Sequence, residues 1–175
     1  TFDGTLPKSL PFTAHPKAAP HTGDLIFFGF NPVAPPHCTI GAISPSGSVK
    51  SLKPLWNHIV GSVFMHDFTV TKSFTVLFEG SMDIEPSRQF FGQNPLQYNH
   101  ERNARFGLIP RSNIDSSHGE PMWIEWESPQ TVFHFVNAWE EMVENNDLDV
   151  VVIGVREDGF FHNALHANGA RKWTK

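Results

Sequence analysis

Hydrophobic residues recur along the chain in short runs, and segments rich in Pro and Gly separate these runs. Some runs alternate apolar and polar positions with a period of two, which is typical of strands with one buried face. The pattern predicts strands at residues 24–30, 64–68, 74–78, 105–109, 122–126, 131–136 and 149–155. A hairpin loop is expected at residues 71–73, between two of these strands. Only residues 138–146 have a helical pattern, and that helix would be short.

Many short strands at close spacing predict an all-β protein, built as a sandwich, a barrel or a propeller. A propeller blade takes four strands and roughly 40–50 residues, so a propeller would give this chain about three to four blades. No repeated sequence motif marks blades, and the pattern alone leaves the three architectures open. Residues 1–175 show no linker and are interpreted as a single domain.

Composition and charge narrow the possible partners. The formal net charge is −5 without a cluster of Lys or Arg, which argues against a nucleic-acid partner because phosphate binding needs a concentrated basic surface. The longest apolar run, Val150–Ile153, predicts a buried strand and is far shorter than the ~18 residues of a membrane span.

The single cysteine, Cys38, excludes an internal disulfide. We expect it to be a small buried residue rather than a nucleophile.

The ends of the chain resemble cut ends. The sequence starts at Thr1 in the middle of a residue pattern, and it stops at Lys175 without a capping residue or a polar tail. We therefore expect a piece of a longer protein. No signal or transit peptide is visible, which for a piece says nothing about location. The sequence predicts no protein partner.

Ten histidines are present, and most have an ordinary explanation. Solvated loop positions are predicted for His21, His37, His100 and His118. His58 follows Trp56 and Asn57 and is interpreted as a buried residue without a ligand role. His162 and His166 would share one face of a helix. The Glu of the zinc-protease pattern is missing between them, so a local zinc site is disfavoured.

Three histidines differ in their setting: His15 precedes a Pro turn, whereas His66 and His134 lie inside apolar runs. A core hydrogen bond would explain any one of them alone. Together they are separated by 51 and 68 residues, which is too wide for a zinc finger and suits ligands delivered by separate sheets to one centre. Neutral imidazole suits iron, copper, nickel or zinc, so the residues alone do not select the metal.

Four segments, taken in order, resemble the carotenoid cleavage dioxygenase family. Their letters are TAHPK with TGDL and FGF, MHDFTVT, RFGLIPR, and FHFVNAWEE; they occupy residues 13–17 with 22–30, 65–71, 105–111 and 133–141. Order and approximate spacing agree over nearly the whole chain. The residues of these motifs are most similar to those of plant-type and microbial members, which include the 9-cis-epoxycarotenoid and apocarotenoid enzymes.

The resemblance implies a seven-bladed β-propeller with ferrous iron, Fe(II), on its axis. The family binds this iron through four histidines without a directly bound carboxylate. By motif, His15, His66 and His134 match three of them, and the fourth would lie beyond this chain. The family's glutamates that hydrogen-bond the histidines also fall outside it. Glu140 and Glu141 match a motif but are not assigned that role.

The implied activity is cleavage of a conjugated double bond in a carotenoid or apocarotenoid by O2, giving two carbonyl products. Phe133, beside the third histidine, would then face the apolar polyene substrate, where its ring could stabilise a cationic intermediate. Core packing explains Phe133 equally well. Two alternatives stay open: cleavage of stilbenes by the same fold, and an inactive truncated chain.

The family's apolar substrates imply peripheral membrane association. The compartment would be the plastid for a plant or algal source and the cytoplasm for a bacterial one.

Overall fold

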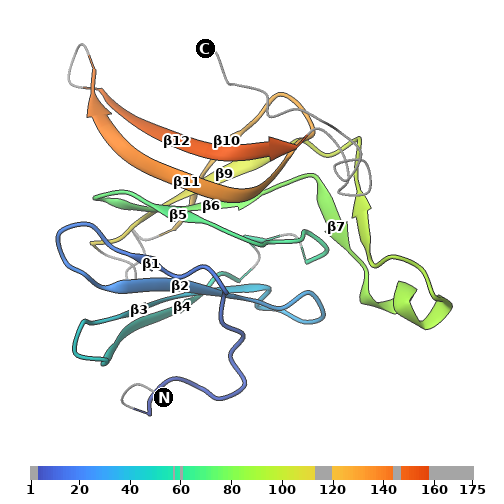
Figure 1. Ribbon diagram of the computed structural model, residues 1–175, viewed down its shortest axis with the longest axis horizontal. Coiled ribbons are helices and arrows are strands. Elements are labelled where there is room, and N and C mark those ends of the chain that lie inside the picture. The colour runs from blue at the N-terminus through green and yellow to red at the C-terminus, as the bar shows by residue number, and fades with distance from the viewer. Residues whose placement is uncertain (1–3, 57, 60, 113–119, 144–146, 158–175) are drawn as a thin grey trace.

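The computed structural model describes residues 4–56, 58–59, 61–112, 120–143 and 147–157. This part of the chain contains strands and one short 3-10 helix, and no α-helix. The strands form two four-stranded and two two-stranded sheets, and all pairs are antiparallel. In Figure 1 three of these sheets follow one another as layers from the blue N-terminal sheet to the orange and red C-terminal pair. The all-β prediction is thereby confirmed for the described residues.

The first layer is a meander of four strands in chain order. Its strands are β1 (Lys17–Ala18), β2 (Leu25–Phe30), β3 (Cys38–Ile43) and β4 (Val49–Pro54). All six residues of β3 are buried, because β3 lies between two neighbours and is covered on both faces. Cys38 is among these buried residues, as expected, and burial raises the pKa of its thiol.

The second layer has the strand order β10-β9-β6-β5. Its strands are β5 (Thr69–Val70), β6 (Phe74–Glu79), β9 (Arg105–Pro110) and β10 (Met122–Glu125). Between β6 and β9 the chain makes a small hairpin of β7 (Met82–Ile84) and β8 (Leu96–Tyr98), with the 3-10 helix η1 (Pro86–Phe91) at its tip. This hairpin projects from the side of the layers in Figure 1.

The third layer is a long two-stranded ribbon of β11 (Thr131–Met142) and β12 (Leu148–Glu157). Two hydrophobic clusters hold the layers together. The larger contains buried residues of the first and second layers, such as Phe28 and Leu77. The smaller contains Phe78 of the second layer and Phe135 of the third. The order of the layers in space therefore follows their order along the chain.

Most predicted strands are present, and three predictions need correction. Residues 64–68 form no regular strand: an isolated bridge at Val63 precedes them, Phe64 N–H donates to the carbonyl of Met82, and ladder pairing begins only at Thr69. Residues 138–142 are not helical; they continue β11, where cross-strand pairing overrides their helical pattern. The remainder of that predicted helix includes residues 144–146, which lie outside the described residues.

The run Val150–Ile153 does form part of β12, but it is only partly buried, and 43% of Ile153 is exposed. The sequence pattern also missed β3 and β4. The described part of the chain contains no helix with the length and hydropathy needed to span a bilayer.

Candidate metal centre

Each of the three layers contributes one histidine close to its first strand. His15 stands two residues before β1, His66 stands three residues before β5, and His134 is the fourth residue of β11. These three strands are neighbours in space, because β5 contacts both β1 and β11. The order of the layers thus brings together residues that are 51 and 68 positions apart along the chain.

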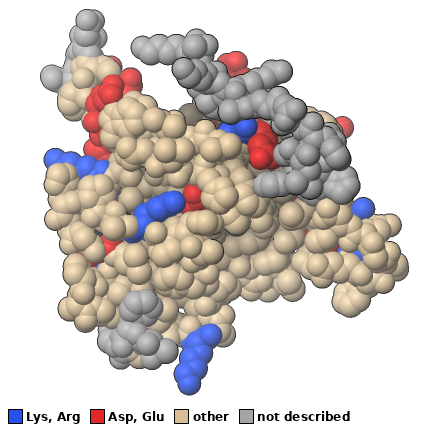
Figure 2. All heavy atoms as spheres, viewed as in Figure 1, with Lys and Arg blue, Asp and Glu red and all other residues tan. Residues whose placement is uncertain are grey.

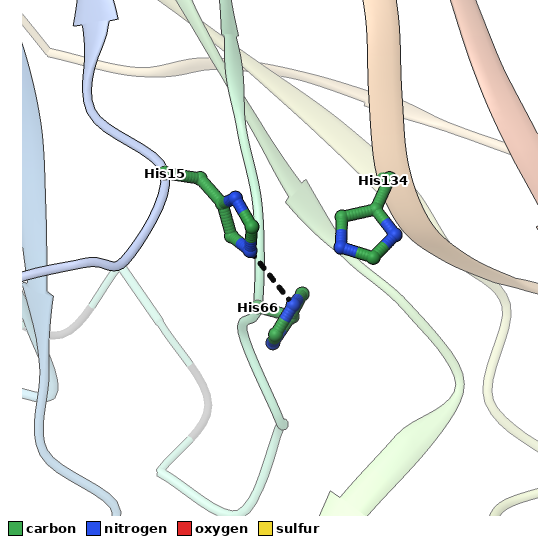
Figure 3. A group of neighbouring side chains, drawn as sticks. All are labelled: His15, His66 and His134. Carbon is green, nitrogen blue, oxygen red and sulfur yellow. Dashed lines mark hydrogen bonds between the residues drawn. The ribbon is translucent and has the colours of Figure 1, made fainter.

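The three imidazole rings converge on one point (Figure 3). One nitrogen of each ring lies within 4.8 Å of the corresponding nitrogens of the other two. The Nε2 atoms of His15 and His66 are 3.0 Å apart. His15 and His66 are half-buried and His134 is exposed. The structure therefore gathers all three histidines that the sequence singled out.

This geometry fits a bound metal ion. Two nitrogens 3.0 Å apart can share a proton in a hydrogen bond. They can equally direct two lone pairs at one ion, since bonds of about 2.1 Å at a right angle place the donor atoms about 3 Å apart. The donor set consists of three imidazoles and contains no carboxylate, which suits a first-row transition metal and not magnesium or calcium.

Electrostatics favour the neutral form of the central histidine. Burial lowers the pKa of His66, and the nearby rings of His15 and His134 lower it further, whereas the Asp67 carboxylate partly opposes the shift. A neutral imidazole is the form that binds a metal, so the lowered pKa of His66 favours its role as a ligand.

A β-bulge in β11 directs two consecutive side chains to this centre. The pairing with β12 shifts between Val132 and His134, so that Phe133 is an extra residue in the ladder. Regular alternation would place Phe133 and His134 on opposite faces, whereas a bulge redirects side chains locally. The ring of Phe133 stacks on His66 with centroids 3.8 Å apart, while the His134 ring meets His66 edge-on at 5.1 Å.

Two carboxylates lie near the histidines and were not assigned from the sequence. Asp67 is buried beside His66, and its signal was present in the sequence, since an acidic residue inside an apolar run must be paired if it is buried. Glu157 ends β12, and burial raises the pKa of its carboxyl group, an effect that attraction to His134 partly offsets.

The described histidines outside the cluster have other environments. His37 donates from Nδ1 to the carbonyl of Asn31 at 2.8 Å, and His58 pairs with Glu120 at 2.6 Å. His21 and His100 are exposed in loops, as predicted. His118, His162 and His166 lie outside the described residues.

Comparison with solved structures defines the class of fold. The chain superimposes on the lignostilbene dioxygenase of Pseudomonas brassicacearum with a TM-score of 0.60 and 22% identity, covering 74% of this chain and 26% of that one. Cobalt-substituted apocarotenoid oxygenase of Synechocystis gives a TM-score of 0.60 with 22% identity over 87% of this chain and 32% of that one. The described chain therefore has a mostly β-strand fold that matches part of the fold of these two proteins.

Residues 1–174 match the family described as retinal pigment epithelial membrane protein. A carotenoid 9,10(9',10')-cleavage dioxygenase of Pisum sativum is 34% identical over 158 residues, which is 83% of this chain and 28% of that protein. A chloroplastic 9-cis-epoxycarotenoid dioxygenase of Arabidopsis thaliana is 32% identical over 154 residues, 87% of this chain and 25% of that protein. The chain belongs to this family, in which the carotenoid cleavage dioxygenases are found, and it spans less than a third of these relatives.

Proposed function

We propose that this chain is part of a non-haem iron(II) dioxygenase that cleaves a conjugated double bond of a carotenoid or apocarotenoid with O2. The observation that carries the proposal is the convergence of three imidazole nitrogens within 4.8 Å, from three separate layers. In this proposal His15, His66 and His134 bind Fe(II), and a fourth histidine comes from a part of the protein beyond this chain. Residues 1–175 then form one partial domain of a seven-bladed β-propeller.

The surroundings of the histidines suit an apolar substrate. The rings of Phe64, His66 and Phe133 lie nearly parallel, with interplanar angles of 20° to 29°. This arrangement places a stack of aromatic rings beside the metal centre, and we assign Phe133 to the substrate tunnel. When bound, ferrous iron supplies the activation of O2 that cleavage into two carbonyl groups requires. The chain's own residues position the three ligand nitrogens and place the Phe133 ring beside them for contact with the polyene.

Carotenoids are favoured over stilbenes by the relatives at more than 30% identity. Those relatives are named as carotenoid or epoxycarotenoid cleavage enzymes, whereas the lignostilbene enzyme is similar at 22% and supports the fold alone. A stilbene-cleaving enzyme of the same fold is the second candidate. The isolated 175-residue chain would lack the fourth ligand, and we expect it to be inactive.

The test uses the full-length protein that contains this chain. We expect bound iron and O2-dependent cleavage of a C40 carotenoid, measured by metal analysis and by chromatography of the products. His66→Ala should abolish both, because it removes a ligand from the centre of the cluster. His100→Ala is the matched control, since His100 is exposed and outside the cluster. Full iron content in His66→Ala, or cleavage of a stilbene but no carotenoid, would contradict the proposal.

Peripheral membrane association is part of the same proposal. Phe90 and Phe91 of η1 are 90% and 78% exposed. They stand at the tip of the projecting hairpin, over which Figure 2 shows few charged side chains. Exposed aromatic rings on a projection suit contact with the lipid surface from which an apolar polyene would be drawn.

A further inference from the structure

The buried carboxylate of Asp67 joins the three segments that carry the histidines. Its side chain is only 1% exposed. One oxygen, Oδ1, accepts hydrogen bonds from the ammonium group of Lys17 and from the N–H of Phe68, both at 2.8 Å. The other oxygen, Oδ2, accepts a hydrogen bond from the N–H of Phe135, also at 2.8 Å. Both oxygens are therefore occupied, and Asp67 has no metal-binding role here.

Every partner of Asp67 is close along the chain to a histidine of the cluster. Lys17 follows His15 by two residues, Asp67 itself follows His66, and Phe135 follows His134. A shift of any one segment relative to the other two would lengthen a hydrogen bond to Asp67. The hydrogen bonds to the Asp67 carboxylate thus depend on the relative positions of all three histidine-bearing segments.

Backbone pairing does not fix this spacing. Strands β1, β5 and β11 belong to three different sheets, so no shared ladder of hydrogen bonds connects them. Side-chain packing between them is also incomplete, because they line a cavity of about 280 Å³ whose walls include Lys17 and Phe135. A buried charged hydrogen bond, in contrast, is short and directional.

We propose that Asp67, paired with Lys17, is a positioning residue that sets the distance between the three histidine nitrogens and thereby the affinity of the metal centre. This inference rests on the proposed iron site. A carboxylate suits the position because all its partners are donors. An amide would have to direct its NH2 group at either the Lys17 ammonium group or the Phe135 N–H, so one donor would face another.

The test measures metal binding in the full-length protein, with Fe(II) and with Co(II), whose visible absorption reports ligand geometry. We expect Asp67→Asn to weaken binding of both ions about 10- to 100-fold, as the loss of partners that orient metal ligands does elsewhere, and to change the Co(II) spectrum. Lys17→Met should act in the same direction and provides a second variant if Asp67→Asn does not fold. Lys17→Arg keeps the cation and should restore most of the affinity.

The matched control is the ion pair of Asp24 with Lys50, at 2.7 Å, which joins the first layer internally and lies outside the cluster. Asp24→Asn should leave metal affinity and the Co(II) spectrum unchanged. The inference is overturned if Asp67→Asn and Lys17→Met bind both ions like the wild type, or if Asp24→Asn weakens binding equally. Wild-type protein that takes up neither ion would overturn the metal centre and this inference together. Weaker metal binding in Asp67→Asn and Lys17→Met, with unchanged binding in Asp24→Asn, supports the positioning role, whatever the substrate is.

Discussion

At the scale of single residues, Glu140 is the second carboxylate that connects layers. Its side chain accepts hydrogen bonds from the Thr71 hydroxyl, from the Ser73 N–H at 2.6 Å and from the Ser73 hydroxyl at 2.9 Å. These donors occupy the turn between β5 and β6, whereas Glu140 belongs to β11. Burial raises the pKa of its carboxyl group, but the hydrogen bonds from Thr71 and Ser73 outweigh this effect and leave the pKa below its ordinary value.

We predict that Glu140→Gln destabilises the protein by about 1–2 kcal/mol at neutral pH, because hydrogen bonds to a charged acceptor are stronger than those to an amide. A lowered folded-state pKa gives stability that is fully present above the ordinary value of 4.5 and lost as the pH falls through the lowered pKa. The difference between variant and wild type should therefore shrink below about pH 4.5. Denaturant unfolding at several pH values between about 3 and about 7 measures this difference in the free energy of unfolding.

Glu141→Gln is the control for this prediction, since Glu141 is an exposed neighbour whose side chain accepts a hydrogen bond from the Trp139 indole. Its change should stay within about 0.5 kcal/mol. A difference for Glu140→Gln that is independent of pH would rule out the charged carboxylate as its source.

At the scale of elements, close contact between an aromatic ring and a glycine builds the first layer. Phe27 of β2 lies opposite Gly41 of β3 in the register. A Cβ atom at Gly41 would come within 2.2 Å of the Phe27 ring, which is fully buried and has no space to move away. Gly107 of β9 has a similar relation to Trp123 of β10, so both four-stranded sheets use this pairing.

Gly41→Ala should therefore cost about 1–3 kcal/mol by overpacking, a loss that thermal or denaturant unfolding detects. Phe27→Leu removes the ring edge that the new methyl group would meet. In a double-mutant cycle, the cost of Gly41→Ala should be smaller in the Phe27→Leu background than in the wild type. Equal costs in both backgrounds would show that the ring does not cause the effect.

At the scale of the whole molecule, three layers stack so that their first strands meet at the histidines, while the β7–β8 hairpin carries Phe90 and Phe91 away from them. We predict that the double substitution Phe90→Ser with Phe91→Ser weakens binding of the full-length protein to phosphatidylcholine vesicles several-fold. Burial of apolar side chains drives such binding. Co-sedimentation with vesicles is the measurement.

Val33→Ser is the control, because Val33 is 77% exposed on a different loop. It should bind vesicles like the wild type, and the iron content of all three proteins should be equal. Vesicle binding unchanged by loss of both Phe side chains would remove η1 from the proposed membrane contact.

The local pattern of residues along the sequence was sufficient to predict part of the fold of this protein. Period-two alternation and Pro- and Gly-rich breaks predict the all-β class and most strands. Successive side chains of a strand point to opposite faces, so the burial of a strand is visible in the order of neighbouring residues. Ordered motifs around His15, His66 and His134 predict the family. The same local pattern failed for residues 138–142, where a helical signal is overridden by pairing with β12, a segment distant in sequence.

The tertiary structure alone decided the geometry of the centre. Spacings of 51 and 68 residues carry no information about distance, and only the stacking of three sheets brings the nitrogens within 4.8 Å. The bulge that directs Phe133 and His134 to the same ring depends on the register with β12. Asp67 appears in the sequence as an acidic residue in an apolar run, but its three donors come from segments that meet only after folding. Sequence thus determined which residues are available, and long-range packing determined which of them act together.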